Sequence, residues 1–363
     1  MPLLDLHAHF PMHTRFPPAF TQGPPPVGQE LEFWVANQLL NYQGGKPRVS
    51  LADLLAGADG GIGSVLYDPD DEFFHDDTPV PGAFANLLAQ MQNVEDEIQG
   101  KVTVVRNPTQ LAACLQNDQR FLFHCVEGGF AFGGDPANAD ILAARGVAYV
   151  ILAHLFYRGV ATCQNAIPFV PDAVFETLLN RQQSSTVGLT DLGVAIADRL
   201  LTNGVILDVT HSSDLAQKQI FDLAQDHGNA PVISSHNGVR AKSNYPLNLS
   251  QEAILRIQAS KGVIGIILYS YWLRQPIDQV LGKDNFTLLF GAIDYIRSVT
   301  GTYDNIAIGT DLDGFIDPVT GCTDYSQTPA LVAAIRAQYP TAADGILWRN
   351  ALNVLQLGWK GVP

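Results

Sequence analysis

The feature of this sequence that most restricts its fold is a series of eight short apolar runs spaced along the whole chain. They are rich in β-branched residues and lie at 3–7, 62–66, 121–126, 147–153, 205–209, 231–235, 263–268 and 306–310. Amphipathic stretches separate most of them, for example 190–203, 214–227, 250–261 and 285–298. Alternating strands and helices form βαβ units around a parallel sheet, and eight units favour a closed barrel over an open sheet. We therefore expect one α/β domain over residues 1–363, a (β/α)8 barrel of the TIM type.

Helix punctuation agrees with this pattern. Thr190 and Ser250 precede two of the amphipathic stretches and are good N-cap residues. Gly204, Gly228 and Gly262 follow three of the stretches, where a glycine commonly ends a helix.

Two stretches exceed a minimal barrel, the Pro-rich segment 11–30 and the acidic segment 67–77. Both follow a predicted strand, so they are loop insertions at the carboxyl-end face, where catalytic loops belong. They either shape the mouth of a pocket or are solvated insertions.

Composition excludes some classes of function. The formal charge is −15, which repels phosphate backbones and anionic lipid heads, so we expect no nucleic-acid or membrane partner. The first residues lack the basic stretch and long apolar run of a signal peptide, and no later segment approaches the ~18 apolar residues that a membrane span needs. A cytoplasmic location is therefore expected, unless a leader has been removed. The four cysteines are far apart and are expected to be reduced thiols: Cys114, Cys125, Cys163 and Cys322.

Side chains that bind metals gather at the ends of the predicted strands. The set is His7, His9, Glu127, His154, His211, His236 and Asp311. In a barrel these ends converge on one rim, and residues two apart on a strand, such as His7 and His9, point the same way. Imidazoles and carboxylates suit Zn²⁺, and two ions about 3.5 Å apart can share a carboxylate and activate a water molecule. The sequence therefore predicts a site for two divalent metal ions, with zinc as the expected metal.

The other four histidines have simpler interpretations. His124 lies inside a predicted strand and is expected to be a packed residue beside the site. His227 ends a helix, where a histidine interacts favourably with the helix dipole. His13 and His75 lie in loops and are weak candidates for the rim of the pocket.

The two carboxylates have distinct expected roles. Glu127 stands before two glycines, and burying its charge needs either a cation or a basic partner such as Arg240. Asp311 lies at the last strand end and is the natural base for a proton from metal-activated water. Asp313 lies past the strand and is expected to be a turn or supporting residue.

Several motifs resemble those of the renal or membrane dipeptidases of the amidohydrolase superfamily. They include DLHAHF (5–10), VEGG (126–129), SSHNGVRA (234–241) and IGTDLDG (308–314), in the family's order. The resemblance implies a (β/α)8 barrel with two zinc ions. It also implies the roles of the site residues: Glu127 as the bridging ligand, His211 and His236 on one metal, His7 and His9 on the other, Asp311 as catalytic acid/base, and His154 and Tyr269 lining the substrate and stabilising the tetrahedral intermediate.

Two positions depart from the family pattern. His9 replaces the Asp that the family usually carries at the second ligand position, so the site loses one negative charge. Leu247 stands where bacterial members commonly have an Arg that faces the substrate carboxylate. Arg240 is the nearest basic residue that could bind substrate in its place, although pairing with a nearby carboxylate is an equally good interpretation.

We expect this chain to be an enzyme that hydrolyses an amide bond, with a dipeptide-like small molecule as substrate. The same chemistry on a lactone, an acylated amino acid or a cyclic amide is the first alternative. A catalytically silent metal-binding barrel is the second. The sequence leaves open whether the chain forms a homodimer.

Overall fold

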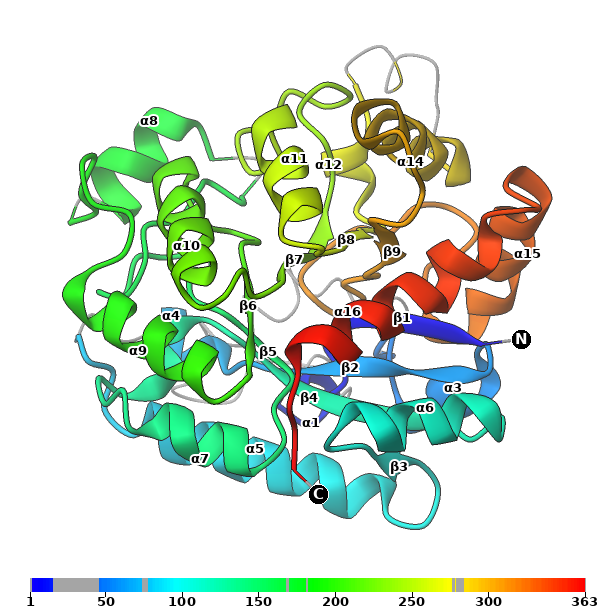
Figure 1. Ribbon diagram of the computed structural model, residues 1–363, viewed down its shortest axis with the longest axis horizontal. Helices are drawn as coiled ribbons and strands as arrows, with labels where there is room; N and C mark the ends of the chain where they lie inside the picture. The colour runs from blue at the N-terminus through cyan, green and yellow to red at the C-terminus, as the bar shows by residue number, and fades with distance from the viewer. Residues whose placement is uncertain are drawn as a thin grey trace, which may run out of the picture.

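Eight parallel strands close into a barrel in this computed structural model, which describes residues 2–15, 46–73, 78–167, 170–180, 182–275, 278 and 284–362. The strands are β1 (Leu3–Ala8), β2 (Gly60–Leu66), β4 (Phe121–Glu127), β5 (Tyr149–Ile151), β6 (Ile206–Asp208), β7 (Val232–Asn237), β8 (Ile264–Ile266) and β9 (Ile306–Ile308). The ring closes because β9 pairs with β1 and β2 pairs with β4. All eight predicted strands are confirmed, and the fold is the expected (β/α)8 barrel (Figure 1).

One further strand was not expected from the sequence. The two-residue strand β3 (Thr103–Val104) pairs with Phe121 and Leu122 at the start of β4. The pairing of β4 with β5 begins further along, at Val126. The short strand therefore extends one end of the sheet without entering the closed ring.

Helices surround the strands in Figure 1. The longer ones are α5 (Ala83–Ile98), α6 (Pro108–Gln116), α7 (Asn138–Ala144), α9 (Asp191–Thr202), α10 (Asp214–Asp226), α11 (Gln251–Ala259), α14 (Phe286–Thr300), α15 (Thr328–Gln338) and α16 (Asn350–Gly358). Shorter helices are α1 (Met12–Arg15), α3 (Leu51–Ala56), α4 (Pro69–Phe73), α8 (Asp172–Val174) and α12 (Ser270–Leu273). Single turns of 3₁₀ or π helix lie at Gly129–Phe132, Phe175–Leu179, Tyr325–Gln327 and Gly345–Arg349.

The predicted helix caps are largely confirmed. The side chains of Thr190 and Ser250 accept hydrogen bonds from the third backbone N–H of α9 and α11. Gly204 and Gly228 take the left-handed conformation, with φ of 70° and 76°. At the end of α11 it is Lys261, not Gly262, that has positive φ, 61°. Gly262 is needed for space, because a Cβ there would lie 1.8 Å from the carbonyl oxygen of Val232.

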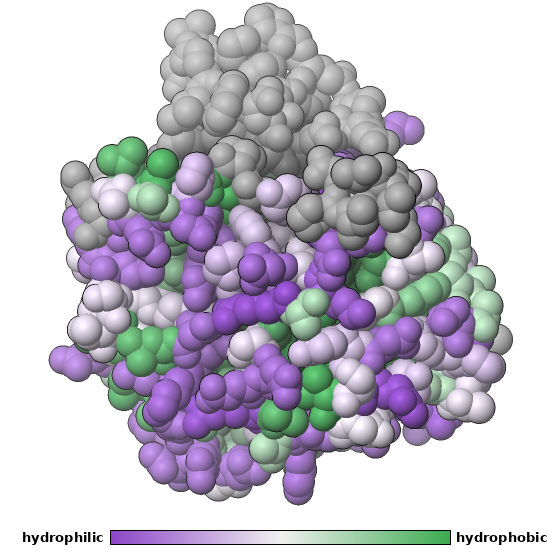
Figure 2. Space-filling model, turned by 90° about the horizontal axis from the view of Figure 1, so that it is seen from above, coloured by the Kyte–Doolittle hydropathy of each residue, from purple (hydrophilic) through white to green (hydrophobic). Residues whose placement is uncertain are grey.

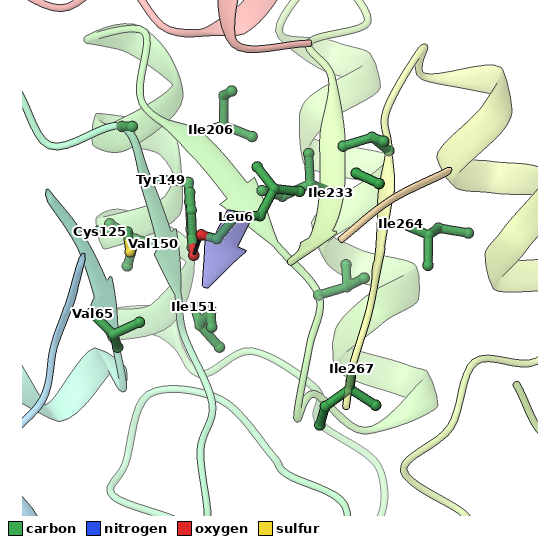
Figure 3. Packing of buried hydrophobic residues seen from close by; sticks show 14 of the residues in the cluster. Leu6, Val65, Cys125, Tyr149, Val150, Ile151, Ile206, Ile233, Ile264 and Ile267 are labelled. Carbon is green, nitrogen blue, oxygen red and sulfur yellow. Dashed lines mark hydrogen bonds between the residues drawn. The ribbon is translucent and has the colours of Figure 1, made fainter. Parts of the chain in front are cut away.

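The barrel interior is filled by side chains below the level of the strand ends. Figure 3 shows Leu6 and Tyr149 next to each other within the hydrophobic cluster. The hydroxyl of Tyr149 donates a hydrogen bond of 2.7 Å to the carbonyl oxygen of Leu6, so its polar group is satisfied in this apolar setting. The packed interior gives the strand ends above it a rigid support.

The two predicted insertions are only partly described. Residues 11–15 contain α1 and residues 67–73 contain α4, whereas 16–30 and 74–77, with His75, lie outside the described residues. Hydrophilic residues cover most of the coloured surface in Figure 2, in keeping with the charge of −15. Within the described ranges, no helix combines the length and the apolar character needed to cross a bilayer.

Candidate metal centre

Seven buried side chains meet where the strands end. Glu127 is the last residue of β4, His7 and His236 lie in β1 and β7, and His9 directly follows β1. The other three each lie three residues past the end of a strand: His154, His211 and Asp311. All seven are at most 5% exposed, so the cluster is shielded from water. The barrel thus brings together all seven side chains that the sequence placed at strand ends.

The carboxylate of Glu127 lies at the centre of this cluster. Its Oε1 is 3.4 to 3.6 Å from the Nε2 atoms of three histidines: His7, His211 and His236. Its Oε2 is 3.2 Å from Nε2 of His9 and 3.5 Å from Nε2 of His154. Each oxygen therefore faces a different set of nitrogens, which is the arrangement of a carboxylate that can bridge two cations.

Asp311 belongs to the same cluster. Its Oδ1 lies 3.2 Å from Nε2 of His9 and 3.7 Å from Nε2 of His7. His7, His9 and Asp311 form one group of ligand atoms close enough to hold a metal ion, and His7, Glu127 and His236 form another. Asp311 is therefore placed to serve as a ligand as well as a base.

Unpartnered atoms show that these residues fit a metal site. Both carboxylate oxygens of Glu127 and Nε2 of His7 are buried and make no hydrogen bond within the described chain. Burying such groups alone costs several kcal/mol unless a cation is shared among them. Burial alone would raise the pKa of Glu127, but His154 and His7 lower it well below its usual value, so the carboxylate is charged. A charged carboxylate ringed by imidazoles is a donor set for divalent metals.

Hydrogen bonds to Nδ1, the ring nitrogen that does not face Glu127, orient the imidazoles of His7 and His236. Nδ1 of His7 lies 3.0 Å from the hydroxyl of Tyr149 and 3.1 Å from Oγ of Ser235. The Tyr149 hydroxyl donates to Leu6, so it accepts from His7. Ser235 also lies 3.1 Å from Nδ1 of His236. A proton held on Nδ1 of His7 leaves the lone pair of Nε2 facing Glu127, as metal ligation requires.

Two residues of the cluster have strained backbones. His211 and Asp311 have φ of 64° and 58°, in the left-handed region that costs a non-glycine residue roughly 1 kcal/mol or more. A buried aspartate supports each segment. Asp208 accepts hydrogen bonds from the N–H and hydroxyl of Thr210, and Asp5 accepts the same pair from Thr310.

The two aspartates also fix the neighbouring strands. Asp5 accepts from the N–H of His7, and Asp208 accepts from the N–H of Ser235. Burial raises the pKa of both carboxyls to about 7. Neither residue was singled out from the sequence, although each lies just before the histidines it supports.

Sequence reasoning also missed Glu72, in α4. Its Oε2 lies 2.6 Å from Nδ1 of His154. Burial alone would lower the pKa of His154, but Glu127 and Glu72 raise it. The sequence predicts the acidic segment 67–77 as an insertion near the site, but nothing in it distinguishes Glu72 from the other acids there.

The two predicted substrate-binding residues differ in their surroundings. The ring of Tyr269 lies 5.5 Å from that of Trp272, which stacks 6.4 Å from the ring of His236. Arg240 forms a paired contact with Asp214, at 2.8 and 2.5 Å, and also donates to the carbonyl oxygen of Pro246. Both of these partners lie outside the cluster. Leu247 is buried, 1% exposed.

The remaining candidates have structural partners. His13 contacts Glu97 at 2.9 Å, and His124 is buried in β4 with Nε2 3.3 Å from Glu95. His227 is the C-cap of α10, as expected.

Asp313 has φ of 65° and accepts backbone hydrogen bonds of 3.0 Å from Arg48 and Val49. It joins the segment before α3 to the loop after β9, which agrees with a supporting role.

A closed parallel barrel with a histidine and carboxylate cluster at the carboxyl ends of its strands defines a class of metal-dependent hydrolases. The sequence comparison narrows the class: residues 1–357 match the model of the membrane dipeptidase family, peptidase family M19, and the chain belongs to that family. It is accordingly an enzyme of the metallo-dipeptidase type that uses divalent metal.

Known relatives are distant but extend over most of the chain. An "Uncharacterized protein in pqqA 5'region" of Klebsiella pneumoniae is 25% identical over 77% of this chain and 99% of its own length. Dipeptidase verJ of Clonostachys rogersoniana is 22% identical over 98% of this chain and 84% of its own length. A metallo peptidase from Rhodobacter sphaeroides, solved with a phosphinate mimic of the dipeptide L-Ala-D-Ala, superposes with a TM-score of 0.76. It is 18% identical, and the superposition covers 99% of both chains.

Proposed function

We propose that this chain hydrolyses the amide bond of a dipeptide-like substrate at a centre of two zinc ions. The observation that carries the proposal is the position of Glu127, whose two oxygens face separate groups of imidazole nitrogens. Glu127 would be the ligand shared by the two ions. His7 and His9 would hold one ion, and His211 and His236 would hold the other.

The metal ions, when bound, would polarise the substrate carbonyl and make a water molecule acidic enough to attack it. Asp311 would accept a proton from the attacking water and pass it to the leaving amine. Its Oδ1 faces Nε2 of His9, which also faces Glu127, so Asp311 would lie close enough to the ions to handle that proton. His154 would donate from Nε2 to the carbonyl oxygen as negative charge develops there. Tyr269 would line the substrate beside Trp272.

One observation favours a second candidate substrate class. The guanidinium of Arg240 is already paired with Asp214, and Leu247 is a buried apolar residue. Neither therefore offers the free cation that best recognises a C-terminal carboxylate. This supports cyclic amides or lactones, which need carry no C-terminal carboxylate, as alternatives to ordinary dipeptides. A silent barrel is a weaker alternative, because every proposed role is filled by a chemically competent residue.

Metal analysis combined with a substrate panel tests the proposal. The purified protein should contain about two zinc ions per chain. It should also hydrolyse at least one of the dipeptides, acylated amino acids, cyclic amides or lactones in the panel, and a chelator should abolish that activity. Bound metal without hydrolysis of any compound would favour the silent barrel.

Three further expectations belong to this proposal. Residues 1–363 are proposed to act as one domain, which limited proteolysis tests. A homodimer stays an open expectation, which light scattering tests. The proposed cytoplasmic location is tested by cell fractionation.

A further inference from the structure

His154 is held from behind by a buried carboxylate. Oε2 of Glu72 lies 2.6 Å from Nδ1 of His154, although the two residues are 82 positions apart in the chain. The hydroxyl of Tyr67 donates to the same oxygen at 2.7 Å, and the N–H of Phe156 donates to Oε1 at 2.8 Å. Glu72 is fully buried. The hydrogen bonds of the Glu72 carboxylate therefore go to His154, to Tyr67 and to the backbone of Phe156, two residues after His154.

The backbone of Glu72 is held by the same loop that carries His154. Arg158 donates from Nε to the carbonyl oxygen of Glu72 at 3.1 Å, and its Nη2 donates to the same oxygen. The guanidinium of Arg158 also lies 5.6 Å from the ring centre of Phe156. The loop after β5 thus contacts both the side chain and the main chain of Glu72, so Glu72 has little freedom to move away from His154.

These contacts leave the imidazole of His154 a single orientation. With Nδ1 bound to Glu72, the opposite nitrogen, Nε2, points at Oε2 of Glu127, 3.5 Å away. The rings of Tyr67 and His211 pack edge-on against the His154 ring, each with centroids 4.6 Å apart. A group that stabilises developing charge works best when it is held in place before the reaction.

We propose that Glu72 is a positioning residue, which fixes the His154 ring so that Nε2 faces the reacting carbonyl oxygen. The inference rests on the proposed function, because His154 acts on the substrate only if the site is hydrolytic. The competing explanation is that Glu72 merely stabilises the loop after β5. The two differ in whether the effect of Glu72 passes through His154.

A measurement on the unaltered, metal-loaded protein tests the contact itself. Long-range ¹H–¹⁵N spectra of ¹⁵N-histidine protein should show a proton on Nδ1 of His154, assigned by its loss in His154→Gln. A bare Nδ1 would overturn the proposal. This readout does not depend on turnover. Hydrolysis without that proton would overturn only the role of Glu72, whereas no hydrolysis with the proton present would overturn the proposed function and this role together.

A double-mutant cycle tests the coupling. Glu72→Gln should lower kcat by about 10-fold or more, because misplacing one donor to the oxyanion is costly. KM should change less, since the donor acts on the transition state. In a His154→Gln background the same substitution should change kcat by less than about 2-fold, because residues that act as a unit are not additive. Equal losses in both backgrounds, or no loss in either, would refute positioning.

Two additional variants complete the design. Glu97→Gln is the matched control, because Glu97 makes the same kind of contact with His13, at 2.9 Å, away from the cluster. It should leave kcat unchanged. Tyr67→Phe removes only the hydrogen bond to Glu72 and serves if Glu72→Gln does not fold. A smaller loss of kcat that also vanishes in the His154→Gln background supports the proposal, and a loss that persists there contradicts it.

Discussion

The Nε2 atoms of His211 and His236 lie 3.1 Å apart at the ends of neighbouring strands. Two imidazoles that both carry a proton on Nε2 could not face each other at this distance. At least one nitrogen must be bare, and both bare nitrogens could share one cation with Oε1 of Glu127, which lies 3.4 Å from His211. The pair therefore marks where a metal ion would bind.

Removing the carboxylate of Glu127 should greatly weaken metal binding at the centre. In Glu127→Gln we expect the metal content to fall from about two ions to fewer than one per chain, because an amide is a poor bridging ligand. Elemental analysis after gel filtration measures this. Glu252→Gln is the control, since the side chain of Glu252 is 81% exposed and contacts Arg256 on the same helix. A Glu127→Gln protein with full metal content would show that the carboxylate is not a ligand.

Asp311→Asn should separate proton transfer from metal binding. We expect turnover to fall by roughly 10²-fold or more, with the metal content nearly intact, because an amide cannot accept the proton. Steady-state kinetics and elemental analysis on the same sample decide this. Because Oδ1 of Asp311 also lies 3.2 Å from His9, loss of one ion is the informative contrary result. It would make Asp311 mainly a ligand.

Ordinary dipeptides should be poor substrates. Because neither Leu247 nor the paired Arg240 offers a free cation for the C-terminal carboxylate, we expect kcat/KM below about 10⁴ M⁻¹s⁻¹ for dipeptides. Substrates with an uncharged or differently placed acid group should give higher values. Arg240→Ala should change the KM for dipeptides by less than about 2-fold, because its guanidinium is engaged by Asp214. Efficient cleavage of a broad dipeptide panel, lost in Arg240→Ala, would identify Arg240 as the anchor after all.

The contact between His13 and Glu97 predicts a pH dependence of stability. Burial alone would lower the pKa of His13, but Glu97 raises it above the usual value. A raised histidine pKa stabilises the fold fully below the unfolded pKa of about 6.5, and the stabilisation is lost as pH rises through the folded pKa. The melting temperature of wild type should exceed that of Glu97→Gln at pH 6 and approach it by pH 9. A constant difference would rule out this linkage.

Glycine substitutions should distinguish space from conformation. A Cβ at Gly262 would lie 1.8 Å from the carbonyl oxygen of Val232, so Gly262→Ala should cost about 2 kcal/mol or more of unfolding free energy. Gly291 lies inside α14, where a Cβ would meet no atom of the described residues within 4 Å, and Gly291→Ala should stabilise by about 0.5 kcal/mol. Denaturant titrations measure both. Similar values for the two variants would contradict the steric argument.

The sequence predicted the barrel well because its signals are local. Each long strand is an apolar run, and the ligands lie next to those runs, as with His211 after β6. The strand β3 was not predicted, because two residues, Thr103 and Val104, are too few to form a recognisable pattern. The contact of Glu72 with His154 was not predicted for a different reason. The two residues are distant in the chain, and only the folded molecule brings them together. The sequence predicted a glycine at the end of α11 but not its role: Lys261 takes the left-handed conformation, and Gly262 provides space beside Val232.

The order of the ligands along the chain has a consequence for assembly. Of the seven clustered side chains, the first, His7, and the last, Asp311, lie at opposite ends of the sequence and meet because β9 pairs with β1. A chain folded only through β5 would present His7, His9 and Glu127 but would lack His211 and His236, so binding of both ions would report that the ring has formed at least through β7. Joining the far ends of a chain is entropically costly, and a shared ion offsets part of that cost. Bound metal would then help to hold distant parts of the chain together, and metal supply during synthesis would govern the yield of native protein.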